Sequence, residues 1–127
     1  MREIKFRAWN KDVYSNKMIY DIQNEFEERI NLGMDSFGNY LNNASFEVMQ
    51  YTGVKDCKGK EIYEGDITIA NNKIFKIVYS KGSFVIYNGN SNIHLIYDLN
   101  IEDNKINNME VIGNIYENPE LLKQREV

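Results

Sequence analysis

Three acidic side chains in the middle of the sequence have the types and the spacing that could do chemistry. Glu61, Glu64 and Asp66 fall within one short segment, and paired carboxylates can act as general acid and base or bind a hard cation. The same segment is typical of a turn that enters a strand, with Gly65 at the bend and Asp66 accepting backbone N–H groups. Because no Asp-x-Asp-x-Asp loop surrounds these residues, we interpret them as structural and predict no catalytic or metal-binding residue.

The other reactive residue types offer little further chemistry. His94 is the only histidine and Cys57 the only cysteine, so the chain can build neither a His/Cys metal cage nor an internal disulfide. Lys58-Gly59-Lys60 lacks the spaced glycines of a phosphate-binding loop. We interpret His94 as a strand residue and Cys57 as an incidental thiol in a turn. The sequence therefore predicts a protein that is not an enzyme and has no cofactor.

Basic and aromatic residues together are the best candidate for a binding surface. Alternation along the first expected strand places Arg7 and Trp9 on one face and Phe6 on the other. Small β-barrels bind single-stranded nucleic acids by stacking bases on such rings beside a basic groove. The alternative is that the rings belong to the core. The candidate macromolecule-binding surface comprises Arg7, Trp9, Tyr51, Lys60 and Tyr63.

Charge favours a protein over a nucleic acid as the partner. The 127 residues carry a net charge of −4, whereas a protein that binds the phosphate backbone generally presents an extended basic footprint. Residues 1–20 carry a basic excess and the segment from residue 98 onward an acidic one. We expect these two ends to attract each other in the fold. The preferred partner is therefore another protein, and a nucleic-acid-binding module is the alternative.

Short, evenly spaced strands are expected to hold these residues in place. Alternating side chains and intervening turn residues predict a hairpin of residues 4–9 and 17–20, followed by strands at 46–51, 61–63, 66–70, 73–79, 83–88, 93–99 and 109–115. A polar connection is expected over residues 100–108. The expected structural turn residues are Gly53, Asp56, Gly59, Glu64, Gly65 and Asp66. Of these, Gly59 and Gly65 are predicted to hold a positive φ on exposed turns.

Helical signals are few and short. Ile22, Phe26 and Ile30 recur at helical spacing, which predicts a short helix over residues 21–31. Residues 32–44 are expected to form loop or irregular strand. Asn118 followed by Pro119 predicts a single helical turn near the C-terminus.

The fold class that follows is mainly β, with short antiparallel strands in a small rolled sheet or barrel. The C-terminal half has the length of a five-stranded barrel of the Src-homology-3 type. We expect one domain over residues 1–127, made of an N-terminal β part with a variable insert (1–54), a barrel-like part (55–122) and a frayed tail (123–127).

Three segments of the sequence form a combined signature. They are REIKFRAW at residues 2–9, MQYTGVKD at 49–56 continuing through GKEIYEGDI at 59–67, and VIGNIYENPELL at 111–122. In this order they resemble the YopX family, a group of small proteins encoded mainly by temperate phages and prophages of Gram-positive bacteria. The family favours a pair such as Lys-Asn where this chain has Cys57-Lys58. The resemblance implies a β-rich phage protein in the host cytoplasm, and it implies no particular activity. With that source, the expected partner is a host or phage protein, and the alternative is a nucleic-acid-binding module in phage replication or transcription.

Localisation and assembly complete the expectations. The N-terminus lacks the apolar stretch of a signal peptide and no run reaches membrane-spanning length, which predicts the host bacterial cytoplasm. Small β proteins with unclosed edge strands often pair with themselves. We therefore predict a homo-oligomer, which light scattering would detect as a mass above that of the monomer.

Overall fold

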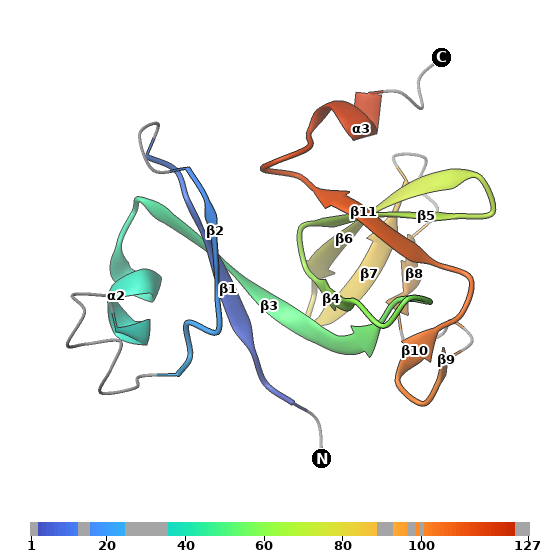
Figure 1. The fold of residues 1–127 in the computed structure, drawn as a ribbon, viewed down its shortest axis with the longest axis horizontal. Helices are drawn as coiled ribbons and strands as arrows, with labels where there is room; N and C mark the ends of the chain where they lie inside the picture. The colour runs from blue at the N-terminus through green and yellow to red at the C-terminus, as the bar shows by residue number, and fades with distance from the viewer. Residues whose placement is uncertain are drawn as a thin grey trace. The chain divides into compact units, whose positions relative to one another are not determined.

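The chain folds into two β-rich units, Met1–Tyr51 and Thr52–Val127, with β3 contributing residues to both (Figure 1). The structure is a computed structural model that describes residues 3–12, 16–24, 36–88, 93–96, 99 and 101–123. Strands far outnumber helices in these ranges, so the predicted mainly β class is confirmed. None of the helices described is long and apolar enough to cross a membrane.

The N-terminal unit is a small antiparallel sheet with a helix packed on one face. Its strands run in the order β2 (Met18–Tyr20), β1 (Phe6–Asn10) and β3 (Phe46–Lys55). The predicted hairpin is confirmed, and Ala8 lies opposite Ile19 in it. Alternation directs Ala8 toward α2 (Phe37–Asn42), where it is fully buried beside Tyr40. Rings complete this core, since Phe46 meets Tyr40 at 4.8 Å between ring centroids.

Helix α2 corrects the prediction of loop or irregular strand over residues 32–44. The helix begins after Ser36, whose side-chain oxygen accepts a hydrogen bond from the Asn39 N–H at 3.4 Å, as an N-cap does. Only one residue of the helix, Tyr40, is buried, so a segment this short shows no apolar period in the sequence. Of the helix expected over residues 21–31, Asp21–Asn24 form a turn and the rest lies outside the described residues.

The C-terminal unit contains a five-stranded antiparallel sheet and a smaller layer opposite it. The sheet runs in the order β11 (Glu110–Asn114), β5 (Asp66–Ala70), β6 (Lys73–Ser80), β7 (Ser83–Tyr87) and β8 (Ile93–Leu95). The smaller layer consists of the end of β3 with β4 (Glu61–Tyr63), β10 (Lys105–Ile106) and β9 (Ile101–Glu102). The predicted C-terminal helical turn is confirmed as α3 (Glu120–Lys123).

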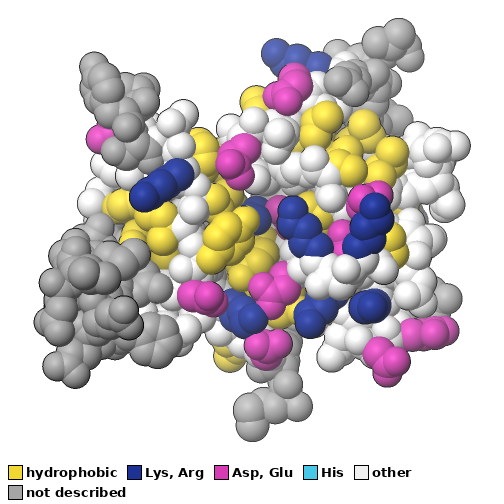
Figure 2. Space-filling model, in the orientation of Figure 1, with side chains coloured by type: hydrophobic (Ala, Val, Ile, Leu, Met, Phe, Trp, Pro, Cys, Tyr) yellow, Lys and Arg dark blue, Asp and Glu magenta, His cyan; other side chains and the backbone are white. Residues whose placement is uncertain are grey.

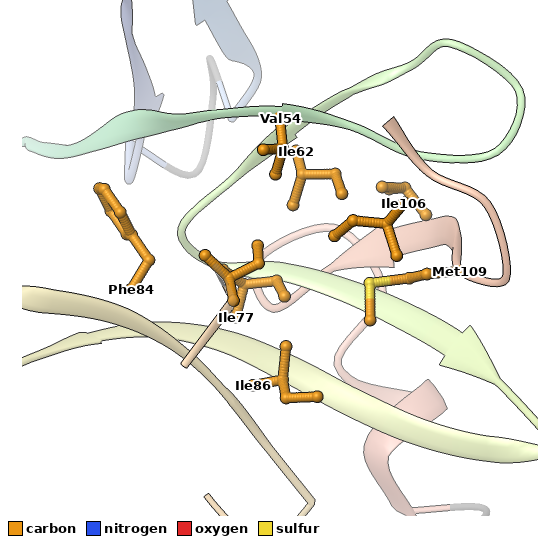
Figure 3. Packing of buried hydrophobic residues seen from close by; sticks show 9 residues of the cluster. Val54, Ile62, Ile77, Phe84, Ile86, Ile106 and Met109 are labelled. Atoms are coloured by element: carbon orange, nitrogen blue, oxygen red, sulfur yellow. The ribbon is translucent and has the colours of Figure 1, made fainter. Parts of the chain in front are cut away.

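Aliphatic side chains from both layers of this unit meet in its core. Ile77 of β6 and Ile86 of β7 are directly paired across the sheet and point toward Val54, Ile62 and Ile106 (Figure 3). Ile62, Ile77 and Ile106 are fully buried. Two layers therefore bury their apolar faces against each other, as small β folds must.

Within the described residues the two sheets close no barrel, although a barrel was one form expected for this half. The outer edge of β11 is instead bonded to a turn. The Val111 N–H donates to the Asp56 Oδ2 at 2.9 Å, and the Met109 carbonyl accepts from the Cys57 N–H at 2.9 Å. A turn that occupies this edge leaves no room there for a closing strand.

Several element boundaries also differ from expectation, and the strand expected over residues 93–99 ends at Leu95 as β8. Thr52-Gly53 does not end β3, which continues to Lys55. Gly53 takes a φ of 94° inside the strand, and the Thr52 hydroxyl bridges the irregularity by donating to the Ile62 carbonyl at 2.7 Å and accepting from the Val54 N–H. The polar connection at 100–108 contains a tight hairpin of β9 and β10, turned by Asp103 and Asn104 at positive φ.

A buried hydroxyl without a partner gives a first testable prediction. Thr68 is fully buried on the inner face of β5, between Phe75 and Val111, and its Oγ1 meets no hydrogen-bond partner among the described residues. Burying an unpaired hydroxyl typically costs about 1–3 kcal/mol. Thr68→Val is therefore expected to raise the free energy of unfolding by about 1 kcal/mol, measured by urea denaturation.

Thr52→Val is the matched control for that measurement. Thr52 is equally buried, but its hydroxyl is hydrogen-bonded on both sides. The same substitution there is expected to lower the free energy of unfolding by about 1–2 kcal/mol. Equal losses at both positions would contradict the assignment of Thr68 as unsatisfied.

Candidate functional site

The acidic turn at Glu64, Gly65 and Asp66 connects β4 to β5 and is held by backbone hydrogen bonds. Asp66 is buried, and its Oδ2 accepts the Tyr63 N–H at 2.8 Å. Gly65 has a φ of 88°, as predicted, although it is buried where an exposed turn was expected. Its N–H donates to the Ile77 carbonyl and its carbonyl accepts from the Ile115 N–H, both at 2.8 Å. Glu64 is half-buried and engages a partner. These contacts join the turn to β6 and to the end of β11.

A second carboxylate, Asp56, organises the preceding turn from inside the protein. Its side chain is 1% exposed. Oδ1 accepts the N–H groups of Lys58 and Lys60 at 2.9 and 2.8 Å, while Oδ2 accepts the N–H of Val111 at 2.9 Å. Gly59 completes the turn with a φ of 83°, as predicted. One buried carboxylate thus closes a lysine-rich turn and attaches it to β11.

The side chains on the outside of this turn are paired or solvated. Lys58 forms an ion pair with Glu110, with Nζ and Oε2 3.0 Å apart. The hydrogen bond and the charge of Glu110 raise the pKa of Lys58 above its ordinary value. Cys57 is a free, exposed thiol and Lys60 is exposed. In the ranges described, no three His, Cys, Asp or Glu side chains are grouped so that they could hold a metal ion.

The five residues of the candidate binding surface do not form an exposed face. Arg7, Tyr51 and Tyr63 are each at most 3% exposed, Trp9 is half-buried and Lys60 is exposed. The first unit holds Arg7, Trp9 and Tyr51, and the second unit holds the other two. Because Arg7, Tyr51 and Tyr63 are buried, most of the charge and ring area expected on this surface is not exposed. His94 lies in β8, as expected of a strand residue.

A smaller group on the N-terminal sheet remains accessible. Trp9 lies opposite Met18, and Arg7 lies opposite Tyr20, in the register of β1 and β2. Alternation directs all four side chains to the face that α2 does not cover. Tyr20 is 48% exposed, and the Arg7 guanidinium carbon lies 6.0 Å from the centroid of its ring. We call Trp9, Met18 and Tyr20 the Trp9 face.

Sequence reasoning identified Trp9 but missed its neighbours. The signal was present, because residues 17–20 were expected to pair with the first strand, but the register of a hairpin with a long connection cannot be read from the sequence. An ion pair borders the Trp9 face, with the Lys11 Nζ and the Glu47 Oε1 3.0 Å apart. Glu47 lies opposite Trp9 on β3. The arrangement is an apolar and aromatic centre with a charged rim.

A comparison with known protein families identifies the family of this chain. A family model described as "YopX protein" matches residues 5–123. The chain belongs to the YopX family. No curated protein sequence matches it significantly.

Two solved structures share the YopX fold of this chain. Protein EF1440 from Enterococcus faecalis is similar at 26% identity and a TM-score of 0.64, with 96% of this chain and 99% of that one covered. Protein yopX from Bacillus subtilis is similar at 18% identity and a TM-score of 0.56, with 96% and 97% covered. The second likeness bears on the fold alone.

The last of the three segments that resemble the YopX family folds into an asparagine clamp. Asn114 is 6% exposed, and its Oδ1 accepts the N–H groups of Tyr116 and Glu117 at 3.0 and 2.8 Å. Its Nδ2 donates to the Glu117 carboxylate at 2.8 Å. The Asn118 Oδ1 in turn accepts the Asn114 N–H at 3.2 Å. The clamp fixes where α3 starts, so this YopX segment positions the backbone that leads into the helix.

Proposed function

We propose that this chain is a non-enzymatic protein-binding module that uses the Trp9 face, and that it acts as a phage-encoded accessory protein in the host bacterial cytoplasm. The observation that carries the proposal is the register pairing of Trp9 with Met18 beside the exposed ring of Tyr20. Tryptophan, tyrosine, methionine and arginine are the residue types enriched at protein–protein interfaces.

The charged residues around the Trp9 face also fit a protein partner. Anchors at an interface work best when a polar rim keeps water away from them, and Lys11 with Glu47 supplies such a rim. Arg7 lies on the same face, with its guanidinium carbon 6.0 Å from the centroid of the Tyr20 ring. The face therefore offers rigid apolar area at a low cost in side-chain entropy.

The acidic residues support a binding role over catalysis. Asp56 and Asp66 are buried and have their oxygens committed to backbone N–H groups. A carboxylate whose oxygens are bonded to backbone N–H groups inside the protein does not contact a substrate. A general acid or base must lie within hydrogen-bonding distance of the reacting atom.

Nucleic-acid binding is the less supported alternative. Three exposed or half-exposed lysines are held in ion pairs, namely Lys5 with Glu3, Lys11 with Glu47 and Lys58 with Glu110. Figure 2 shows basic and acidic side chains interspersed on the face that it displays, around hydrophobic ones. Interspersed charge of this kind does not make the continuous basic track that a phosphate backbone requires.

Affinity purification of the tagged protein from phage-carrying host cells tests the proposal. We expect proteins that co-purify with the parent to be lost with Trp9→Ala and kept with Leu41→Ala. Leu41 is the matched control, because it is 55% exposed and lies on α2 of the same unit. Thermal melts of both variants check that the unit is folded.

Two results would contradict the proposal. Identical co-purification by the parent and Trp9→Ala would exclude the Trp9 face. Salt-dependent retention on single-stranded DNA or RNA that Trp9→Ala weakens would assign the face to nucleic acid instead.

A further inference from the structure

Strand β2 is the terminal strand of the N-terminal sheet. The order is β2-β1-β3, and within the described residues β2 pairs with β1 alone. A terminal strand has one row of backbone N–H and C=O groups directed away from its neighbour. Which residues supply that row follows from the hydrogen-bond register.

The register identifies Met18 as a residue whose backbone groups face outward, and Tyr20, two residues further on, has the same phase. The Asn10 N–H donates to the Lys17 carbonyl at 3.0 Å, so this pair is a hydrogen-bonded one. In an antiparallel ladder such pairs alternate with pairs that point their backbone groups outward. Ala8 and Ile19 form the next bonded pair, and Trp9 opposite Met18 is the outward pair between them. Just before β3, the Ser45 carbonyl accepts a hydrogen bond from the Lys11 N–H. This bond shows that Trp9 directs its backbone groups toward β3 and not toward β2.

Beyond β2 the chain closes the exposed edge of β1 with its own groups. The Phe6 N–H donates to the Gln23 Oε1 at 2.9 Å, and the Phe6 carbonyl accepts from the Ile22 N–H at 3.3 Å. Asp21, at a φ of 58°, turns the backbone out of the strand to make this possible. Among the residues that the structure describes, no strand pairs with the outer edge of β2, whereas the edge of β1 beside Phe6 is closed.

We infer that β2 accepts an extended segment of the partner protein as an added strand, with alternate side chains of that segment packed on the Trp9 face. This inference rests on the proposed function and names the shape of the partner. Only an extended backbone repeats donors and acceptors at the spacing that β2 presents. Because the side chain of Met18 lies on the Trp9 face, the backbone pairing and the apolar contacts occur at one place.

The geometry also defines the chemistry of the segment. Its residues beside Met18 and Tyr20 share the Trp9 face, so two apolar residues separated by one position are required. Lys17 is exposed at the start of β2 and favours an acidic residue opposite it. Proline is excluded where the segment bonds to Met18. The segment is short, because β2 has three residues.

A displayed library of random 12-residue peptides, selected on the purified full-length protein, tests the inference. We expect selected peptides to show the apolar-x-apolar pattern without proline and to protect the Met18 amide from hydrogen exchange by at least tenfold. Met18→Pro removes the outward N–H at the centre of the Trp9 face without touching a bond to β1, and is expected to reduce peptide affinity at least tenfold. Met18→Ala, which keeps the N–H, is expected to reduce it less.

The possible outcomes separate this inference from the proposed function. Peptides that lose affinity with Trp9→Ala but bind Met18→Pro as tightly as Met18→Ala would overturn strand addition and leave the Trp9 face as a binding site. Failure to select any peptide, or selection of peptides indifferent to both sites, would overturn strand addition while co-purification still tests the face. A mass that falls from oligomer to monomer with Met18→Pro, without peptide binding, would make the occupant a second copy of this chain and overturn a foreign partner.

Discussion

Asp56→Ala is expected to lower the free energy of unfolding by about 3–5 kcal/mol. The substitution removes the acceptor of three backbone N–H groups, those of Lys58, Lys60 and Val111. The Val111 N–H is buried, so its loss of a partner carries the full desolvation cost. Urea denaturation followed by circular dichroism measures the change.

Two further variants serve as controls for this measurement. Asp56→Asn keeps one oxygen for the turn but places an amide N–H₂ group against the Val111 N–H, so an intermediate loss is expected. Glu102→Ala removes an exposed carboxylate of the same unit, and a change within about 0.5 kcal/mol is expected. If Asp56→Ala proved as mild as Glu102→Ala, the Asp56 carboxylate would not be the link between the turn and β11.

Gly113→Ala is expected to cost about 2–3 kcal/mol although it adds a single methyl group. A Cβ at Gly113 would lie 2.5 Å from the Asn118 Oδ1, 2.8 Å from its Cγ and 2.9 Å from its Cβ. Asn118 cannot simply rotate away, because its Oδ1 holds the Asn114 N–H. The thermal midpoint of the variant should fall clearly below that of the parent.

Gly38→Ala is the matched control, since a Cβ at Gly38 meets nothing within 4 Å and the residue lies inside α2. Alanine is expected to stabilise that helix by up to about 1 kcal/mol. A double-mutant cycle isolates the clash. In an Asn118→Gly background, which removes all three clashing atoms, Gly113→Ala should cost less than in the parent. An unchanged cost would show that the strain lies elsewhere than in the clamp.

Local chemistry was sufficient to predict much of this fold. Alternation and turn residues located most strands, because the side-chain period of a strand and the steric freedom of glycine act over a few residues. Gly59 and Gly65 adopt the expected positive φ, and Asp66 accepts the backbone N–H expected of a turn aspartate. Helix α2 was not predicted, because about two helical turns bury too few side chains to show a helical hydrophobic period in the sequence.

The candidate site was decided by tertiary structure. Asp56 meets Val111 across 55 positions of sequence, and no local pattern encodes such a pairing. Arg7 and Tyr51 alternate like surface residues but are buried, since burial depends on what packs on a strand. Trp9 meets Met18 only through a register that the folded hairpin selects. The sequence by itself thus determined the strands, the turns and the family resemblance. The tertiary structure decided which rings and carboxylates are accessible, because accessibility is a property of contacts between segments that are distant along the chain.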